Sequence, residues 1–324
     1  MGYHASMLDR TDTPVLFCNF NRPQLTSRVL ECIRQRKPSM LLLACDGPRP
    51  DVADDAAKVQ QTREILNSID WPCDVRQRFL ETNAGCKHAI ADAITWAFQQ
   101  TERLIVLEDD CLPDPTFFDF CGQLLDRYES DPQVMMIGGV NFQPGPRSDA
   151  SYYFSRWPHI WGWATWKEAW SNFDVDISSW PEKRGTDVLK RIFSDSIQSD
   201  HWTRTFDTQH AGAIDTWDFP WTYAVWENDG FAILPQQNLV KNIGFGASAT
   251  HTVDAESKLA NMSTAPIEEL VHPNQQEIDV EADAFTWENI FLPGVQLPEP
   301  VRKRPASSLF RKLRRLRNRL VAKS

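Results

Sequence analysis

The stretch Arg103-Leu-Ile-Val-Leu-Glu108-Asp109-Asp110 decides the fold that this sequence predicts. Its apolar run is typical of a strand that is buried on both faces. The three adjacent carboxylates that follow repel one another and are costly to desolvate unless a cation neutralises them. In an open α/β sheet, ligands bind just beyond the carboxyl ends of the strands. We therefore predict a site for a hard divalent cation here. The alternative is a solvated acidic turn before the helix that follows Pro115.

Short apolar strands and amphipathic helices alternate on both sides of this stretch. Apolar runs predict further strands at residues 14–18, 40–45 and 134–137, and we expect a more polar strand at 75–79. Apolar residues at helical spacing predict helices at residues 23–33, 59–69, 89–98 and 117–128. Such alternation predicts an α/β fold with a mostly parallel, Rossmann-like sheet flanked by helices. A nucleotide would lie at the carboxyl edge of that sheet.

Charge and motifs argue against several classes of protein. The 324 residues carry a net charge of −10, but residues 301–324 hold ten Lys or Arg and no acid. The remaining 24 basic and 44 acidic residues give residues 1–300 a net charge of −20, which argues against a nucleic-acid partner. No glycine-rich dinucleotide fingerprint follows the first strand, and no P-loop is present. A dinucleotide oxidoreductase and a P-loop ATPase are therefore disfavoured.

Cysteine usage bears on the compartment. All seven cysteines lie between Cys18 and Cys121 without a Cys-x-x-Cys pair, which is typical of reduced thiols. The sequence has no apolar run that approaches 18 residues, and Met1 to Thr13 lacks an apolar signal-peptide core. These observations predict a cytoplasmic protein.

Polar side chains also follow the other predicted strands. Asp46 ends the second strand, where it could accept hydrogen bonds from a ribose or form an Asx turn with Gly47. Asn83 and Lys87 stand at the start of a helix, where helix N–H groups and an ammonium could meet a phosphate. An ordinary N-cap followed by a solvated lysine remains the alternative for this pair.

Taken in order, these motifs resemble the GT-A glycosyltransferases, in particular the bacterial family-2-like enzymes. They are Asn19-Phe-Asn21-Arg22-Pro23, Asp46-Gly47, Asn83-x-Gly85-Cys86 and Glu108-Asp109-Asp110, within about residues 14–255. The resemblance implies a nucleotide-sugar donor, usually UDP-linked, and a Mn²⁺ or Mg²⁺ ion that bridges its diphosphate. It puts the direct metal bond on Asp110. It puts donor binding on Asn19, Asn21, Arg22, Asp46, Asn83, Lys87, Glu108 and Asp109.

The second half of the chain is rich in tryptophan. Ten of the thirteen tryptophans lie between Trp157 and Trp226. Indoles stack on the C–H faces of sugars, but we expect most of the ten in the core. Only His159, Trp161 and Trp163 are assigned to an acceptor-binding wall. The two indoles would share a face only if the segment around Gly162 is extended.

The segment Asp215-Thr-Trp217-Asp218-Phe-Pro-Trp221 offers a catalytic base. Inverting glycosyl transfer needs a carboxylate that takes the proton of the acceptor hydroxyl. The segment resembles the base region of the N-acetylglucosaminyltransferase I family, and the match puts this role on Asp218. Pro220 displaces the second tryptophan by one place relative to that family, so Asp215 and Glu227 remain competitors. A helix N-cap is the structural alternative for Asp218.

In many GT-A enzymes a late histidine joins the metal or the diphosphate. The resemblance puts this role on His251, for which a purely structural role is the alternative. We expect a catalytic domain at residues 1–255, an extension at 256–300 that wraps the core, and a basic tail at 301–324. Leucines recur at helical spacing among the arginines of the tail, as in helices that lie on anionic membranes. A docked or disordered tail is the alternative.

The sequence therefore predicts a metal-dependent, inverting glycosyltransferase that acts on a glycan or lipid-linked acceptor. It would be cytoplasmic, and held at the inner membrane face if the tail binds lipid. A sugar-phosphate nucleotidyltransferase would share the sheet and the metal, but such enzymes usually carry a glycine-rich signature after the first strand. A non-catalytic glycan-binding protein could use the tryptophans and would not need the acidic triplet.

Overall fold

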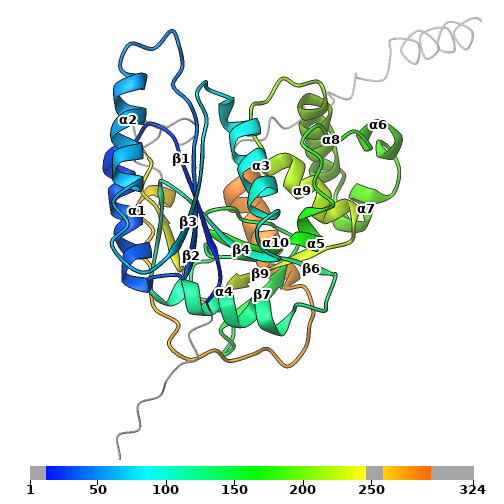
Figure 1. The fold of residues 1–324 in the computed structure, drawn as a ribbon. Helices are drawn as coiled ribbons and strands as arrows, with labels where there is room; N and C mark the ends of the chain where they lie inside the picture. Colours follow the sequence, from blue (N-terminus) through cyan, green and yellow to red (C-terminus); the bar gives the residue numbers. More distant parts are fainter. Residues whose placement is uncertain (1–11, 246–257, 293–324) are drawn as a thin grey trace, which may run out of the picture. The chain divides into compact units, whose positions relative to one another are not determined.

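The computed structural model describes residues 12–245 and 258–292, which belong to one compact unit that extends to Pro293. Eight strands of these residues form one sheet in the order β3-β2-β1-β4-β8-β6-β9-β7 (Figure 1). The strands are β1 Val15–Asn19, β2 Met40–Cys45, β3 Asp74–Phe79, β4 Arg103–Glu108, β6 Val134–Gly138, β7 Tyr152–Ser155, β8 Trp163–Trp166 and β9 Phe231–Pro235. Two short strands, β5 (Cys111–Pro113) and β10 (Val240–Asn242), form a separate antiparallel pair.

The predicted α/β sheet is confirmed. Strands β3, β2, β1 and β4 are parallel neighbours, and β6 pairs in parallel with β9. All five predicted strands are present. The sheet is nevertheless mixed, because β8 lies antiparallel between β4 and β6, and β7 is antiparallel at the edge.

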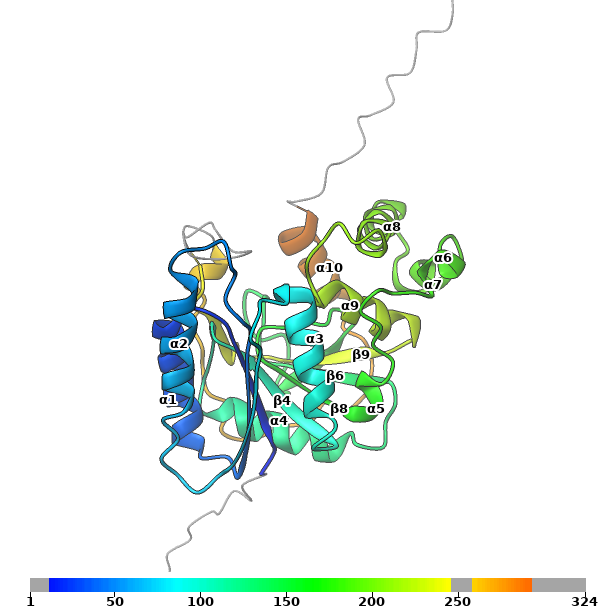
Figure 2. The same cartoon turned by 45° about the horizontal axis from the view of Figure 1, so that its top comes forward.

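Helices cover both faces of the parallel part of the sheet. Figure 2 shows α1 and α2 side by side on one face and α3 on the other. The α-helices are α1 Pro23–Arg36, α2 Asp55–Leu66, α3 Gly85–Ala97, α4 Thr116–Arg127, α5 Lys167–Trp170, α6 Trp180–Lys183, α7 Val188–Ile192, α8 Ser196–His210, α9 Asp218–Glu227 and α10 Val280–Thr286. A 3-10 turn, η1 (Lys258–Asn261), and a π-helical turn, η2 (Trp287–Phe291), complete the elements. The prediction that the second helix extends to Ile69 is wrong, since α2 ends at Leu66, although Ile69 still packs against the core.

The core follows the two-residue alternation of the strands. Val15 and Phe17 of β1 belong to the same buried cluster as Leu41 and Leu43 of β2, against α1, α2 and α4. Each fully buried side chain of this size contributes about 1.5–3 kcal/mol of transfer free energy. Of the ten tryptophans between residues 157 and 226, only Trp161 is not buried. A core role for most of them is therefore confirmed.

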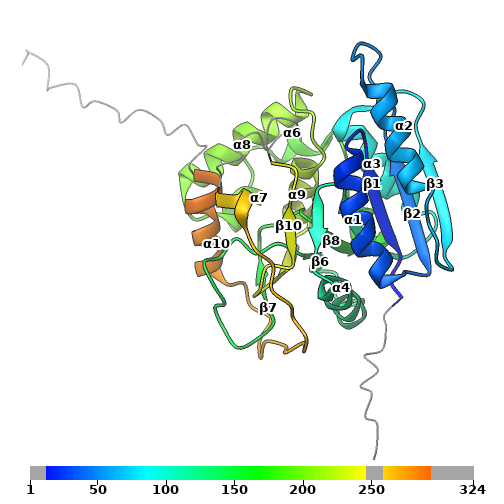
Figure 3. The same cartoon turned by 90° about the vertical axis from the view of Figure 1, so that its left-hand side faces the viewer.

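The later part of the segment 258–292, which includes α10, packs on the β7 side of this unit (Figure 3). Ile278 forms a β-bridge with Phe154, and the Ser151 N–H donates to the Val271 carbonyl at 2.7 Å. In α10, the Asp283 carboxylate accepts a hydrogen bond of 2.6 Å from Ser155 Oγ. The compact unit therefore includes this segment and has its boundary at residue 293. Residues 301–324 lie outside the described part of the chain.

All seven cysteines are free thiols, as their spacing predicts. Within residues 12–245 and 258–292, no helix has the length and apolar character that crossing a membrane requires.

Gly47 offers a test of how closely the loops at the carboxyl edge pack. A Cβ on Gly47 would lie 2.3 Å from the backbone carbonyl carbon of Thr82, so Gly47→Ala has to displace that loop. We expect the free energy of unfolding, measured by urea denaturation, to fall by about 1–3 kcal/mol. Gly145→Ala is the matched control, because nothing lies within 4 Å of its added Cβ. Equal stability of the two variants would contradict this packing.

Candidate functional site

A pocket of about 480 Å³ opens at the carboxyl ends of β1, β2 and β4. Its walls come from the loops after these strands, the start of α3, the loop before α9 and the end of β10. The predicted site residues that line it are Asn19, Asn21, Arg22, Asp46, Asn83, Glu108, Asp109, Asp110, Trp161 and Asp218. Segments up to 224 residues apart in the chain, from Cys18 to Asn242, therefore meet in one cavity, at the sheet edge where the sequence predicts a ligand.

Arg22 joins the two aspartates of the acidic triplet. Its Nε donates to Asp109 Oδ2 at 3.2 Å, and its Nη2 contacts Asp109 Oδ1. Its Nη1 donates to Asp110 Oδ2 at 2.9 Å. The Asp109 side chain is only 3% exposed, and that of Asp110 is 13% exposed. One guanidinium group therefore holds two largely buried carboxylates beside each other.

The pocket carries more negative than positive charge. Six carboxylates line it, with the guanidinium groups of Arg22 and Arg49. Burial, together with repulsion from Asp110 and Asp109, raises the pKa of Glu108. Burial also raises the pKa of Asp109, against the opposing effect of Arg22. Such a group of acids would be stabilised by a further cation.

The chain's own N–H groups saturate Asp46. Its Oδ1 accepts from the N–H groups of Gly47 (2.7 Å) and Ala84 (2.9 Å), and its Oδ2 from Asn83 Nδ2 (2.8 Å) and the Gly85 N–H (3.2 Å). Asp46 does not form the Asx-type turn, because the local N–H that it accepts belongs to the next residue, Gly47, and Pro48 has no N–H to donate. Its hydrogen bonds instead tie the loop after β3 to the end of β2. The Asp46 side chain still lines the pocket.

The start of α3 is capped from a distant segment. Asp215 Oδ1 accepts from the Lys87 N–H at 3.0 Å. The Lys87 ammonium donates to Asp176 at 2.8 Å, and Lys87 does not line the pocket. The predicted phosphate contact of Lys87 has no support in this geometry, because a carboxylate of the chain already meets the helix N-terminus.

Asp218 is the first residue of α9 and lines the pocket. Its Oδ1 accepts from Thr216 Oγ1 and from the Phe219 N–H at 2.9 Å. Its competitor Glu227 ends the same ten-residue helix, about 13 Å further along the axis. Glu227 accepts from Ser179 Oγ at 2.9 Å and does not line the pocket.

Of the three residues assigned to the acceptor wall, only Trp161 lines the pocket. Its ring packs edge-on against Phe142, with a centroid separation of 5.3 Å. Trp163 is 1% exposed and stacks on Trp217 in the core. The segment is not extended, because Gly162 has φ +64°, and the two indoles therefore do not share a face.

His159 lies outside the pocket lining as well. Its ring packs against Phe142, and burial lowers the pKa of His159 to about 3. The imidazole is therefore neutral at physiological pH, and its assignment to the acceptor wall stays a prediction.

The segment after β10 lies against the acidic triplet. The Ile243 N–H donates to the Asp110 carbonyl at 2.8 Å. A Cβ on Gly244 would lie 2.4 Å from Asp110 Oδ2, so the backbone passes directly beside this carboxylate. His251, the predicted late metal ligand, lies outside the described residues.

The sequence did not point to Arg49 and Asp55. Arg49 lines the pocket, and its guanidinium lies over the Phe20 ring at 5.2 Å from the centroid. Asp55, which is 1% exposed, accepts from Arg49 and, at 2.6 Å, from Asn21 Nδ2. The Asn21 hydrogen bond and the Arg49 contact with Phe20 tie the loop after β1 to this ion pair. The sequence does show an arginine, Arg49, in the loop after Asp46. Nothing local indicates that its partner is Asp55, six residues further along the chain.

The donor set at the end of β4 is compatible with Mg²⁺ or Mn²⁺. In the part of the chain that the structure describes, no three His, Cys, Asp or Glu side chains form a complete metal cage. Mg²⁺ in particular commonly takes only one or two protein carboxylates and completes its shell with substrate phosphates and water. Asp109 and Asp110 supply such a pair beside a cavity that could hold a phosphate group.

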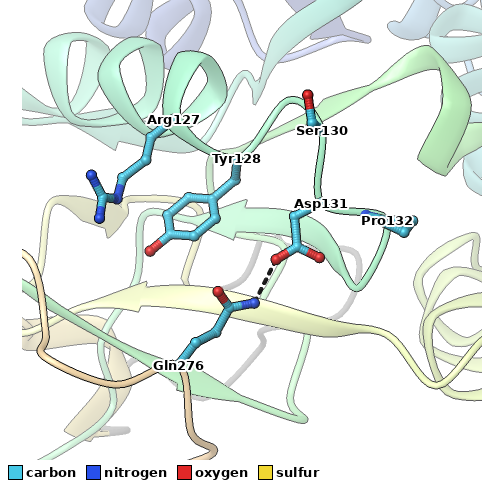
Figure 4. Close-up of a pocket in the computed structure, with 6 residues that line it drawn as sticks. All are labelled: Arg127, Tyr128, Ser130, Asp131, Pro132 and Gln276. Carbon is cyan, nitrogen blue, oxygen red and sulfur yellow. Dashed lines mark hydrogen bonds between the residues drawn. The ribbon is translucent and has the colours of Figure 1, made fainter.

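A second hollow lies at the other end of the strands, around the loop between α4 and β6. Figure 4 shows its lining residues, among them Arg127, Tyr128 and Asp131. Gln276 Nε2 already donates to Asp131 at 2.6 Å. None of the predicted site residues within the described ranges lines it.

No family model and no curated protein matches this chain. Among the solved structures that do, a UDP-glucose pyrophosphorylase solved with UDP-glucose has a TM-score of 0.26 at 10% identity. The match covers 44% of this chain and 62% of that one, less than two thirds of its length. A cytidylyltransferase from Leptospira borgpetersenii has a TM-score of 0.31 at 11% identity, over 59% and 72%. Likeness this low carries no argument about activity.

Asp215 allows a test of the α3 cap. Asp215→Ala removes the acceptor of the Lys87 N–H, and we expect a loss of about 0.5–2 kcal/mol in the free energy of unfolding. Asp215→Asn keeps an oxygen acceptor of the same shape and should lose less. Urea denaturation of both variants measures the difference. If Asp215→Ala is as stable as the parent protein, the cap contributes nothing.

Proposed function

We propose that this protein is a metal-dependent, inverting glycosyltransferase of the GT-A type that uses a nucleotide-diphospho-sugar, most simply a UDP-sugar. The observation that carries the proposal is the convergence of the acidic triplet and Asp218 on one pocket at the carboxyl edge of the parallel strands. The volume of that pocket, about 480 Å³, lies in the range of small-molecule sites.

The donor would occupy the part of the pocket between β1, β2 and β4. Asn19, Asn21 and Arg22 line it after β1, and Asp46 with Asn83 lines it after β2 and β3. Asp110 with Asp109 would hold Mn²⁺ or Mg²⁺, which neutralises the charge that develops on the leaving diphosphate. Lys87 is not part of this proposal, because its ammonium is paired with Asp176.

Asp218 is the proposed general base. Thr216 Oγ1 and the Phe219 N–H both donate to its Oδ1, so the orientation of the carboxylate is fixed at the start of α9. It would accept the proton of the acceptor hydroxyl as that oxygen attacks the sugar. The burial of Trp217 and Trp221 nearby limits access of water. Glu227 is remote from the pocket, and Asp215 is committed to α3, which favours Asp218 over both.

The acceptor would approach along Trp161, whose ring lines the pocket. We propose a glycan or a lipid-linked glycan as acceptor, in a cytoplasmic enzyme that the basic residues 301–324 hold at the inner membrane face. His251 is retained as a possible late ligand of the metal or diphosphate.

Donor binding can be tested by a thermal-shift screen of nucleotide sugars with and without Mn²⁺. We expect one UDP-sugar to raise the melting temperature of the parent protein only when Mn²⁺ is present. Asp110→Asn should abolish this shift, because the amide is a poor ligand for a hard cation. An equal shift for parent protein and variant would show that Asp110 does not bind the metal.

The same preparations separate glycosyl transfer from nucleotidyl transfer. A glycosyltransferase releases UDP from the stabilising UDP-sugar when an acceptor is added. A nucleotidyltransferase instead forms the UDP-sugar and pyrophosphate from UTP and a sugar 1-phosphate. Pyrophosphate formation without UDP release would overturn the proposal.

The base can be tested by Asp218→Asn, which keeps the shape of the side chain but removes the proton acceptor. The rate of transfer at saturating donor should fall about 10²–10⁴-fold, the usual contribution of a positioned base. Donor affinity should remain, since the donor contacts lie on other loops. Glu227→Gln is the matched control on the same helix and should retain its turnover. The reverse pattern would assign the base to Glu227.

A further inference from the structure

We propose that Arg22 is a positioning residue that exchanges its carboxylate partners for the donor diphosphate. In the structure its guanidinium takes the place beside Asp109 and Asp110 where a divalent cation would be held. The proposal rests on the proposed function, and it adds a role for Arg22 before and during donor binding.

The backbone at Arg22 is held by α1, and its side chain is held by contacts to Asp109 and Asp110 at the pocket. Arg22 is the N-cap residue of α1, and its carbonyl accepts from the N–H groups of Leu25 (3.1 Å) and Thr26 (3.0 Å). Pro23 follows at the first helical position. The Arg22 side chain is 21% exposed and lines the pocket. It can therefore turn toward the cavity without unwinding α1.

Arg22 and a divalent cation compete for the same carboxylate. Nη1 donates to Asp110 Oδ2, the carboxylate that a metal would need. Arginine does not lose its proton in proteins, so the competition cannot be relieved by deprotonation. Two positive groups a few ångströms apart in a partly buried site repel each other more strongly than they would in water. A bound cation therefore displaces Nη1 from Asp110.

A diphosphate offers the displaced guanidinium a new partner. Arginine binds phosphate oxygens through two parallel hydrogen bonds, in the same geometry that it uses on Asp109. The Arg22 side chain thus weakens cation binding when no nucleotide is present and strengthens nucleotide binding once the cation is in place. A purely structural arginine, which only neutralises buried acids, would have a different effect, since its loss would weaken both.

The test compares the parent protein with Arg22→Met, which keeps the length of the side chain and removes its charge. Titration calorimetry with Mn²⁺ alone should show about 10- to 100-fold tighter binding by the variant, the scale expected for removing a like charge close to the ion. Titration of UDP at saturating Mn²⁺ should show about 10-fold weaker binding, since charge-assisted hydrogen bonds are lost.

Arg49→Met is the matched control, because Arg49 is the other guanidinium of the pocket but is paired with Asp55. Its Mn²⁺ affinity should stay close to that of the parent protein. If Arg22→Met does not fold, Arg22→Lys serves instead, since an ammonium cannot contact both aspartates with a planar fork and should give a smaller tightening. Mn²⁺ binding by the Arg22 variant that is no tighter than the parent's overturns the exchange. Absence of UDP binding to the parent protein would instead overturn the proposed function.

Discussion

The negative charge at the end of β4 is the constraint on which the site depends. The acidic triplet stands at the end of β4, directly after Leu104 to Leu107, which are fully buried. The carboxylates of Glu108, Asp109 and Asp110 therefore border a low-dielectric interior. Arg22 compensates part of this charge from the loop that follows the neighbouring strand β1. Strand β1 pairs in parallel with β4, with Cys18 opposite Glu108. Parallel pairing of β1 with β4 therefore creates the ion pairs, and the ion pairs in turn make the acidic edge compatible with folding.

Other carboxylates hold the loops around the pocket by accepting hydrogen bonds from N–H groups of the chain. Asp46 accepts four hydrogen bonds from the loops after β2 and β3, and Asp215 caps α3 from the segment before α9. Each carboxylate fixes a loop that would otherwise be positioned only by packing. The acids thus divide into two groups. Asp46 and Asp215 are used by the chain itself, whereas Asp109 and Asp110 share one arginine.

Apolar runs were sufficient to predict β1, β2 and β4 of the parallel half, because these strands are buried on both faces and bounded by turn residues. The edge strand β3 is more polar and more exposed. The acidic triplet was predictable because it follows the buried strand β4 directly. The antiparallel strand β8 was not predictable, because its residues could not be told apart from the rest of the tryptophan-rich core. The divergence of Trp161 and Trp163 depends on one backbone angle at Gly162. The partners of Arg22, Asp215 and Lys87 lie 87 to 128 residues away, beyond the reach of local pattern.

The most direct test of the account is a crystal structure of the protein soaked with UDP and MnCl₂, with anomalous diffraction recorded at the manganese edge. The account predicts one anomalous peak within bonding distance of an Asp110 carboxylate oxygen and of oxygens from both phosphates, with the uridine in the pocket beside Asp46. A peak at another place, or UDP bound in this pocket with no manganese between Asp110 and the diphosphate, would contradict it.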